Sequence, residues 1–95
     1  MSNMFNPPHP GRIVKESMEH LGLGVRGLAR ALHVSPATVQ RIISGKAAIS
    51  PEMSIRLETV IGSRADTWMS MQTTYDLWQV RQNFDTSSLQ SLRQS

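Results

Sequence analysis

Hydrophobic residues recur at three- and four-residue intervals along most of this 95-residue chain, and polar residues fill the positions between them. The first segment with this spacing covers residues 10–21, places Val14, Met18 and Leu21 on one face, and stops at Gly22. Four more helical segments follow, and none has the pattern of a β-strand. The pattern predicts an all-α protein of five helices.

Two short helices joined by a tight turn are predicted next. The first of the pair covers about residues 25–32. The second has Ser35 as its N-cap and Pro36 at its first position, where the fixed φ suits the helix and the missing N–H costs no hydrogen bond. It ends near Ser44, with Gly45 beyond it.

The last two helices carry similar start and stop signals. Ser50 and Pro51 begin the fourth helix, which stops at Gly62. Its apolar face consists of Met53, Leu57, Val60 and Ile61. The fifth helix is predicted to start with Ser63 as N-cap and Asp66 three residues on, a shorter version of the capping box, and to continue to about residue 80 or 83.

The chain is long enough for one compact domain and too short for two. We expect residues 1–83 to form that domain, with the fifth helix, about residues 64–82, as a candidate dimer element. Residues 84–95 are rich in Ser, Gln and Thr, so a flexible tail is expected, although Leu89 and Leu92 leave open a short helix against a partner.

Composition narrows the function classes. The chain has no cysteine, which excludes a disulfide framework, a thiol nucleophile and cysteine-ligated zinc. Its N-terminus lacks the pattern of a signal peptide and no apolar run approaches a membrane span, so we expect a cytoplasmic protein. His9, His20 and His33 lack metal-site spacing, and no catalytic triad or phosphate loop is apparent. We expect no metal, no cofactor and no enzymatic activity.

The charge is unevenly distributed along the chain. Residues 1–46 hold six basic and two acidic side chains, a net charge of +4, whereas residues 47–95 hold four basic and five acidic ones, a net charge of −1. A basic half suits phosphate binding, but it is equally typical of a solvated surface. The charge alone does not distinguish these two alternatives, so the sequence motif within residues 1–46 is considered next.

Residues 25–44 have the pattern of a helix-turn-helix. Their shared core is predicted to consist of Leu28, Ala29, Leu32, Val34, Val39 and Ile42. The outer face of the second helix carries Pro36, Ala37, Thr38, Gln40, Arg41 and Ser44. Small residues let such a helix sit deep in a major groove, and Gln and Arg match the donors and acceptors of base edges. The motif therefore predicts binding to double-stranded DNA.

This motif resembles the Cro and repressor class of helix-turn-helix proteins, and its flanks resemble the HigA antitoxin family, once called virulence-associated protein I. The flanking motifs are His9-Pro10-Gly11, Ser44-Gly45-Lys46 with Ile49-Ser50-Pro51, Trp68, Met71-Gln72 and Tyr75-Asp76-Leu77-Trp78. Together they extend the resemblance over about residues 9–81. The resemblance implies a dimeric antitoxin that represses its own operon and neutralises a messenger-RNA-cleaving toxin.

The same resemblance assigns roles to residues of the motif. It places Pro36, Ala37, Thr38, Gln40 and Arg41 toward the groove, with Ser35 and Lys46 at phosphates on the edges of the motif. We add Ser44, from the same outer face, to the DNA-binding set.

The chain departs from the family pattern at three positions. Val25 stands where relatives have a polar residue that contacts phosphate. Either Arg26 makes this phosphate contact instead, or this chain lacks it. His33 stands where the turn usually has Gly, a position that favours positive φ. Gly27 replaces a good helix former and costs about 1 kcal/mol of helix propensity.

Trp68, Met71, Tyr75 and Trp78 follow a 3-4-3 spacing that places them on one face of the fifth helix. Most of this stripe is expected to be core. A domain this small rarely buries two Trp and a Tyr completely, so we predict that part of the stripe pairs with a second subunit.

Arg41 is the strongest candidate for reading a base, and a solvated arginine is the alternative. Two other functions also stay open at this point: a stand-alone phage-type repressor, and a toxin-binding protein with little DNA binding.

Overall fold

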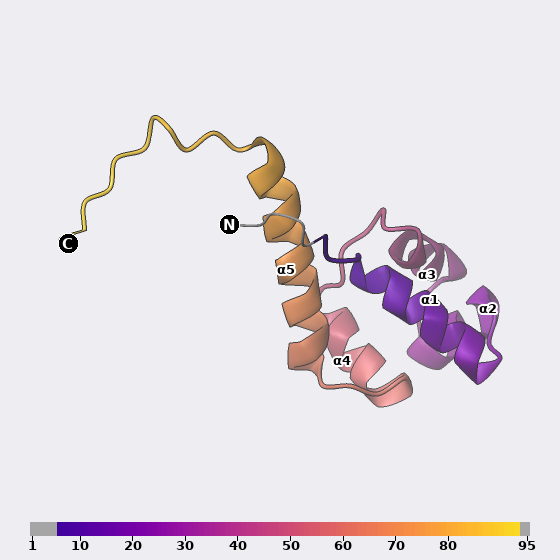
Figure 1. Cartoon of the computed structure of the whole chain (residues 1–95). Coiled ribbons are helices and arrows are strands. Elements are labelled where there is room, and N and C mark those ends of the chain that lie inside the picture. Colours follow the sequence, from indigo (N-terminus) through magenta and orange to yellow (C-terminus); the bar gives the residue numbers. More distant parts are fainter. Residues whose placement is uncertain (1–5, 94–95) are drawn as a thin grey trace.

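The computed structural model describes residues 6–93 and contains five α-helices joined by short turns (Figure 1). Their bounds are α1 Pro10–Leu21, α2 Val25–Leu32, α3 Pro36–Ile43, α4 Pro51–Val60 and α5 Ala65–Asn83. No β-strand occurs in this part of the chain. The prediction of an all-α, five-helix fold is therefore confirmed.

Side-chain caps start three of the helices, and the sequence predicted two of them, Ser35 and Ser50. His9 Nδ1 accepts a hydrogen bond from the Gly11 N–H (2.9 Å) at the start of α1. Ser35 and Ser50 each accept from the N–H three residues on, at 3.1 Å, at the starts of α3 and α4. A proline follows each cap and removes an N–H that would have no partner in the first turn.

The start of α5 differs from the prediction. Ser63 is not its N-cap, because this residue has a left-handed backbone with φ 63° and belongs to the turn after Gly62. Arg64 is the N-cap and makes no side-chain capping bond. The Glu58 carboxylate of α4 instead accepts a hydrogen bond from the first N–H of α5 (2.9 Å). The predicted capping box of Ser63 and Asp66 was wrong, because Ser63 lies in a left-handed turn and the helix begins one residue later than predicted.

One hydrophobic core joins all five helices. It consists of Val14, Met18, Leu28, Ala29, Leu32, Val39, Ile42, Ile49, Met53, Leu57 and Trp68. α1 and α3 cross within it at Gly11, where a Cβ would lie 1.8 Å from the Ile42 carbonyl oxygen. No side chain fits between the two backbones at this point, so the crossing requires glycine.

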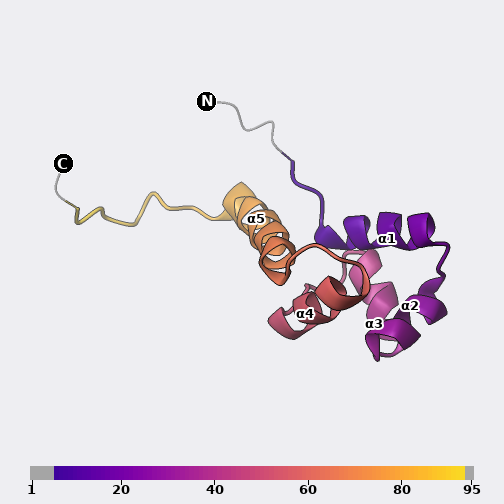
Figure 2. The same ribbon diagram turned by 90° about the horizontal axis from the view of Figure 1, so that it is seen from below.

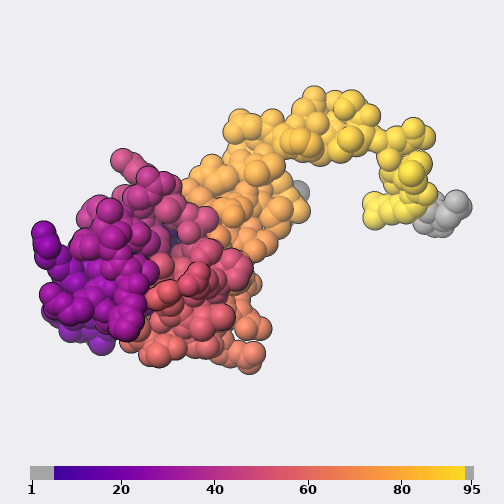
Figure 3. Space-filling model, turned by 180° about the vertical axis from the view of Figure 1, so that it is seen from behind, coloured from indigo at the N-terminus to yellow at the C-terminus, as the bar shows by residue number. Residues whose placement is uncertain are grey.

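The helices form a body, which consists of α1 to α4 and the first half of α5, and an arm, which is the second half of α5. α5 packs against α4 and α1, and the pair α2 and α3 lies at the other end of the molecule (Figures 1 and 2). The second half of α5 projects from the body, and the residues after it run onward without a helix (Figure 3). Between residues 6 and 93, no helix is both long and apolar enough to cross a membrane.

Candidate nucleic-acid interface

The turn between α2 and α3 is built on a left-handed residue. His33 has φ 60° and ψ 44°, the left-handed conformation that favours glycine. The Val34 N–H donates to the Ala29 carbonyl (3.0 Å), and the Val34 side chain packs against the core. This geometry ends α2 and redirects the chain into α3 within three residues.

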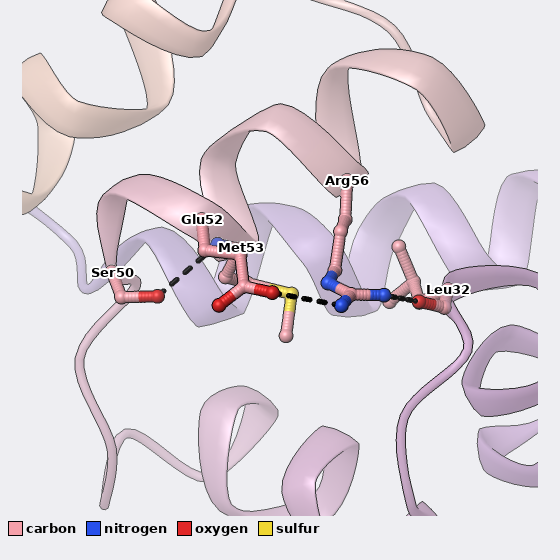
Figure 4. A network of polar contacts seen from close by, with 5 residues as sticks. All are labelled: Leu32, Ser50, Glu52, Met53 and Arg56. Carbon is pink, nitrogen blue, oxygen red and sulfur yellow. Dashed lines mark hydrogen bonds and ion pairs between the residues drawn. The ribbon is translucent and has the colours of Figure 1, made fainter.

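α4 holds this turn from outside the motif. The Arg56 guanidinium donates to the Leu32 carbonyl, the last residue of α2, at 2.7 Å and pairs with the Glu52 carboxylate at 2.8 Å (Figure 4). A cation at the C-terminus of a helix also complements its dipole. This contact could not be predicted from local sequence patterns, because Arg56 and Leu32 are 24 residues apart.

The predicted DNA-binding side chains lie on the surface of the motif. Arg26, Ser35, Pro36, Ala37, Gln40, Arg41, Ser44 and Lys46 are exposed, and Thr38 is half-buried. Most belong to α3 and its two ends, which gives one continuous element that could enter a groove.

The hydroxyl groups at the two ends of α3 already make hydrogen bonds within the motif. Ser35 Oγ accepts from the Thr38 N–H and shares a second hydrogen bond with Thr38 Oγ1 (2.9 Å). Ser44 Oγ donates to the Arg41 carbonyl (3.2 Å). These hydroxyls hold the ends of α3, and their remaining lone pairs and protons are what a phosphate would meet.

The charged residues of α2, α3 and the loop after α3 are all basic. No acidic residue occurs between Glu19 and Glu52, whereas the same stretch holds Arg26, Arg30, Arg41 and Lys46. None of these four cations forms a salt bridge within the described residues. Arg30 was missed by the sequence analysis, although its i, i+4 spacing from Arg26 on α2 was the signal that could have found it.

α3 is tied to the loop that follows it. The N–H groups of Lys46 and Ala47 both donate to the Arg41 carbonyl, at 2.8 and 3.0 Å, and Gly45 has φ 79°. The Lys46 side chain is exposed beside the end of α3. Its position at the edge of the motif suits a phosphate contact.

The stripe predicted on α5 is only partly available to another subunit. Trp68 is 1% exposed, and its Nε1–H donates to the Gly62 carbonyl (2.9 Å), so this side chain belongs to the core of its own protomer. Its assignment to a dimer interface is corrected accordingly. Met71, Tyr75 and Trp78 are half-buried, and Met71 packs against the core.

A second apolar stripe lies on the opposite side of α5. Leu77 and Val80, with Phe84 at the C-cap, are 48%, 55% and 61% exposed. Successive residues are offset by about 100° around a helix, so Leu77 lies opposite Trp68. This stripe was not predicted from the sequence, because the spacing of the Trp and Tyr residues dominates the apolar pattern of the helix.

Gln72 and Asp76 were quoted above as part of the family motifs, with no role assigned to either; the structure shows what they contact. Gln72 is 4% exposed, accepts from the Ile49 N–H (2.8 Å) and donates to Asp76 Oδ1 (2.9 Å).

The His9 ring stacks edge-to-face on Tyr75, with ring centroids 4.9 Å apart. Burial lowers the pKa of His9 below 6.5, against smaller opposing effects of the Asp76 charge and a hydrogen bond to the Ala47 backbone.

Comparison with known proteins decides the family. Residues 14–68 match a protein-family model described as helix-turn-helix. YddM, an HTH-type transcriptional regulator of Escherichia coli, is 40% identical over 89 residues, which cover 94% of this chain and 95% of that protein. The antitoxin HigA-1 of Vibrio cholerae is 30% identical and aligns over 82% of this chain and 74% of its own. The chain belongs to the HigA antitoxin family.

A further relative and two solved structures are also similar to this chain. Virulence-associated protein I of Dichelobacter nodosus is 38% identical over 79% of this chain and 70% of its own. The antitoxin GraA has a TM-score of 0.86 at 32% identity, covering 93% of this chain and 99% of its own. PA4674 of Pseudomonas aeruginosa, solved with its 18-base-pair operator, has a TM-score of 0.83 at 32% identity, covering 90% and 97%. The resemblance to the HigA family that was expected from the sequence is confirmed.

Proposed function

We propose that this chain is the antitoxin of a toxin-antitoxin system: a DNA-binding autorepressor that acts as a homodimer and neutralises a cognate messenger-RNA-cleaving toxin. The exposed outer face of α3, with Gln40 and Arg41 on a surface without acidic residues, carries the DNA-binding part. PA4674, which is 32% identical to this chain and was solved in complex with its operator DNA, supports the same part. The antitoxin part rests on membership of the family.

Within this proposal, each part of the interface has a role. Arg41 and Gln40 read base edges, while Pro36, Ala37 and Thr38 let α3 approach the groove closely. Arg26, Ser35, Ser44 and Lys46 contact phosphates and fix the register.

The homodimer is supported by the two apolar faces of α5. One face packs into the core through Trp68, while Leu77 and Val80 on the other remain exposed to solvent in a single chain. A helix that is apolar on both sides is normally covered on both. We therefore place the dimer contact on the second half of α5, along Leu77, Val80 and Phe84, with Trp78 nearest to it. Met71 and Tyr75 face the side of α5 that lies against the body, so their role in the subunit contact stays a prediction. A two-fold dimer then presents two copies of α3 to successive major grooves, about 34 Å apart.

Selection of binding sites from a random DNA pool, repeated at two salt concentrations, tests the repressor function. We expect enrichment of a symmetric sequence and weaker binding at the higher salt concentration, because phosphate contacts release counterions. Failure to enrich any symmetric sequence would contradict the repressor function and favour a toxin-binding protein with little DNA binding.

Co-expression with the neighbouring open reading frame tests the antitoxin function. We expect the small protein encoded there to co-purify with this chain and the complex to retain binding to DNA upstream of the two genes. Specific DNA binding with no co-purifying partner would favour a stand-alone repressor of the phage type.

A toxin-binding protein with little DNA binding is the second candidate. It is favoured by the N-terminus of α2, where Gly24 caps the helix without a side-chain hydrogen bond and Val25 supplies no polar group. This candidate predicts co-purification of the neighbouring protein without enrichment of any DNA sequence, so the two experiments separate it from the main proposal.

A further inference from the structure

The inner face of α5 contacts three different parts of the molecule in succession. Trp68 binds the turn before α5 through the Gly62 carbonyl, Gln72 binds the loop after α3, and Tyr75 packs on His9 at the start of α1. These three residues follow i, i+4, i+7 spacing and share one side of the helix. Gln72 makes a direct hydrogen bond to the segment that continues from α3.

A chain of backbone contacts connects Gln72 to α3. Gln72 Oε1 accepts from the Ile49 N–H, and the Ile49 side chain is 1% exposed in the core. The loop that carries Ile49 begins at the end of α3, where two of its N–H groups donate to the Arg41 carbonyl. The position of α3 is therefore transmitted to α5 through one short loop and one buried side chain.

Asp76 fixes the orientation of the Gln72 amide. Asp76 Oδ1 accepts from Gln72 Nε2 at 2.9 Å, which leaves Oε1 directed at Ile49. Both functional atoms of the buried amide are thus satisfied, each by a partner in a defined direction. A hydrogen bond restricts rotation and sliding of α5 in a way that an apolar contact of similar size does not.

We propose that Gln72 is a positioning residue that sets the separation of the two recognition helices, and thereby the half-site spacing of the operator. The proposal rests on the dimer function proposed above, in which α5 carries the contact between subunits. The angle between α5 and α3 within each subunit then determines where each α3 lies relative to the two-fold axis. Because one base pair advances the duplex by about 3.4 Å, small displacements in both subunits change the preferred spacing.

The test measures operator binding over a series of sites whose central spacer is shortened or lengthened by single base pairs. The selected symmetric site supplies the series, and a single half-site serves as the internal reference. For Gln72→Met we expect unchanged binding to the half-site and a preserved dimer. The preference for the natural spacing should fall by about two- to tenfold, the factor that corresponds to one hydrogen bond.

A donor and acceptor exchange separates positioning from packing. Gln72→Glu places a second carboxylate beside Asp76 and should lower the spacing preference. Gln72→Glu combined with Asp76→Asn lets the Asn amide donate to the new carboxylate, which still accepts from Ile49, and should restore the preference. This pair also keeps the test decisive if Gln72→Met does not fold.

Each outcome has a distinct meaning. A spacing preference that is unchanged in a dimeric Gln72→Met or Gln72→Glu variant overturns the proposal, as does a loss that the double variant fails to restore. If the wild-type chain is monomeric or selects no symmetric site, the proposed dimeric repressor fails first, and the proposal fails with it. A fall in preference with intact half-site binding, restored by the double variant, supports it.

Discussion

The exposed faces of α3 and α5 differ in kind, although both helices bury their other face in the same core. Exposed large apolar side chains are absent from α2 and α3 within the described chain, and their outer surface is polar and basic. α5 exposes Leu77 and Val80 opposite its buried Trp68. The first surface is stable in water and suited to a charged partner, whereas the second lowers its free energy when another apolar surface covers it.

This difference separates two tasks in a very small protein. In the proposed function α3 has to stay accessible, and it is held from behind by Gly11 of α1 and through its turn by Arg56 of α4. In the proposed homodimer α5 carries the subunit contact, and it is held only at its inner face. The following variants test the two regions separately, from the largest expected effect to the smallest.

Gly11→Ala should destabilise the body most. Its Cβ would lie 1.8 Å from the Ile42 carbonyl oxygen, so the backbones of α1 and α3 must move apart. We expect a loss of about 3 kcal/mol or more in the free energy of unfolding, measured by urea denaturation. Gly27→Ala is the control, because its Cβ meets only the Leu23 side chain, at 3.2 Å. Helix propensity then favours Ala by about 1 kcal/mol. Equal stability of Gly11→Ala and wild type would disprove the close crossing.

Leu77→Asp combined with Val80→Asp should separate the dimer and leave the body folded. Losing the second half-site contact should weaken operator binding by about 100-fold. Analytical ultracentrifugation measures the association state, circular dichroism the helix content, and a DNA titration the affinity. Leu21→Asp is the matched control, because Leu21 is 52% exposed on α1 and away from α5. A double variant that remains dimeric places the subunit contact elsewhere.

Arg41→Ala should cost about 1–3 kcal/mol of operator binding and relax the preference at one base position. Lys46→Ala should weaken binding to all sequences alike and lower the slope of log affinity against log salt by about one. Titrations on the selected site and on random DNA distinguish the two effects. An equal loss on both DNAs for Arg41→Ala would remove Arg41 from the base-reading residues.

Arg56→Met should lower the free energy of unfolding by about 1–2 kcal/mol, because it removes a charge-assisted hydrogen bond to the Leu32 carbonyl. Glu52→Gln removes only the ion pair, whose Glu side chain is 76% exposed, and should cost below about 0.5 kcal/mol. Thermal unfolding of both variants measures the difference. Equal effects would mean that the ion pair, and not the bond to α2, carries the contribution.

The smallest effect concerns pH. The pKa of His9 is lowered in the folded state, mainly by burial, so the unfolded chain binds this proton first as the pH falls. Its stabilising contribution is complete above pH 6.5 and is lost as the pH falls through the folded pKa. His9→Asn keeps a capping group without a titrating ring. The melting temperature of wild type should therefore fall more steeply than that of His9→Asn between pH 7 and pH 5, and parallel curves would refute this role.

Local chemistry allowed much of the fold to be predicted. Ser-Pro pairs at residues 35–36 and 50–51 and the periodicity of residues 25–42 act over a few residues, so the sequence specified the starts of α3 and α4 and the inner face of the motif. The same local signals failed at Ser63. There the left-handed turn and a distant acceptor, Glu58, displaced the start of α5 by one residue.

The sequence by itself determined the five helices, the polar face of α3 and the family, because each depends on residue types at short spacings. Only the tertiary structure decided which side of α5 is covered. Trp68 and Leu77 are both large and apolar, and their burial depends on whether Gly62, Ile49 and His9 come to lie against that side. Contacts between residues 20 or more positions apart, such as Gln72 with Ile49 and Arg56 with Leu32, leave no periodic trace in the sequence. Packing alone brings these partners together.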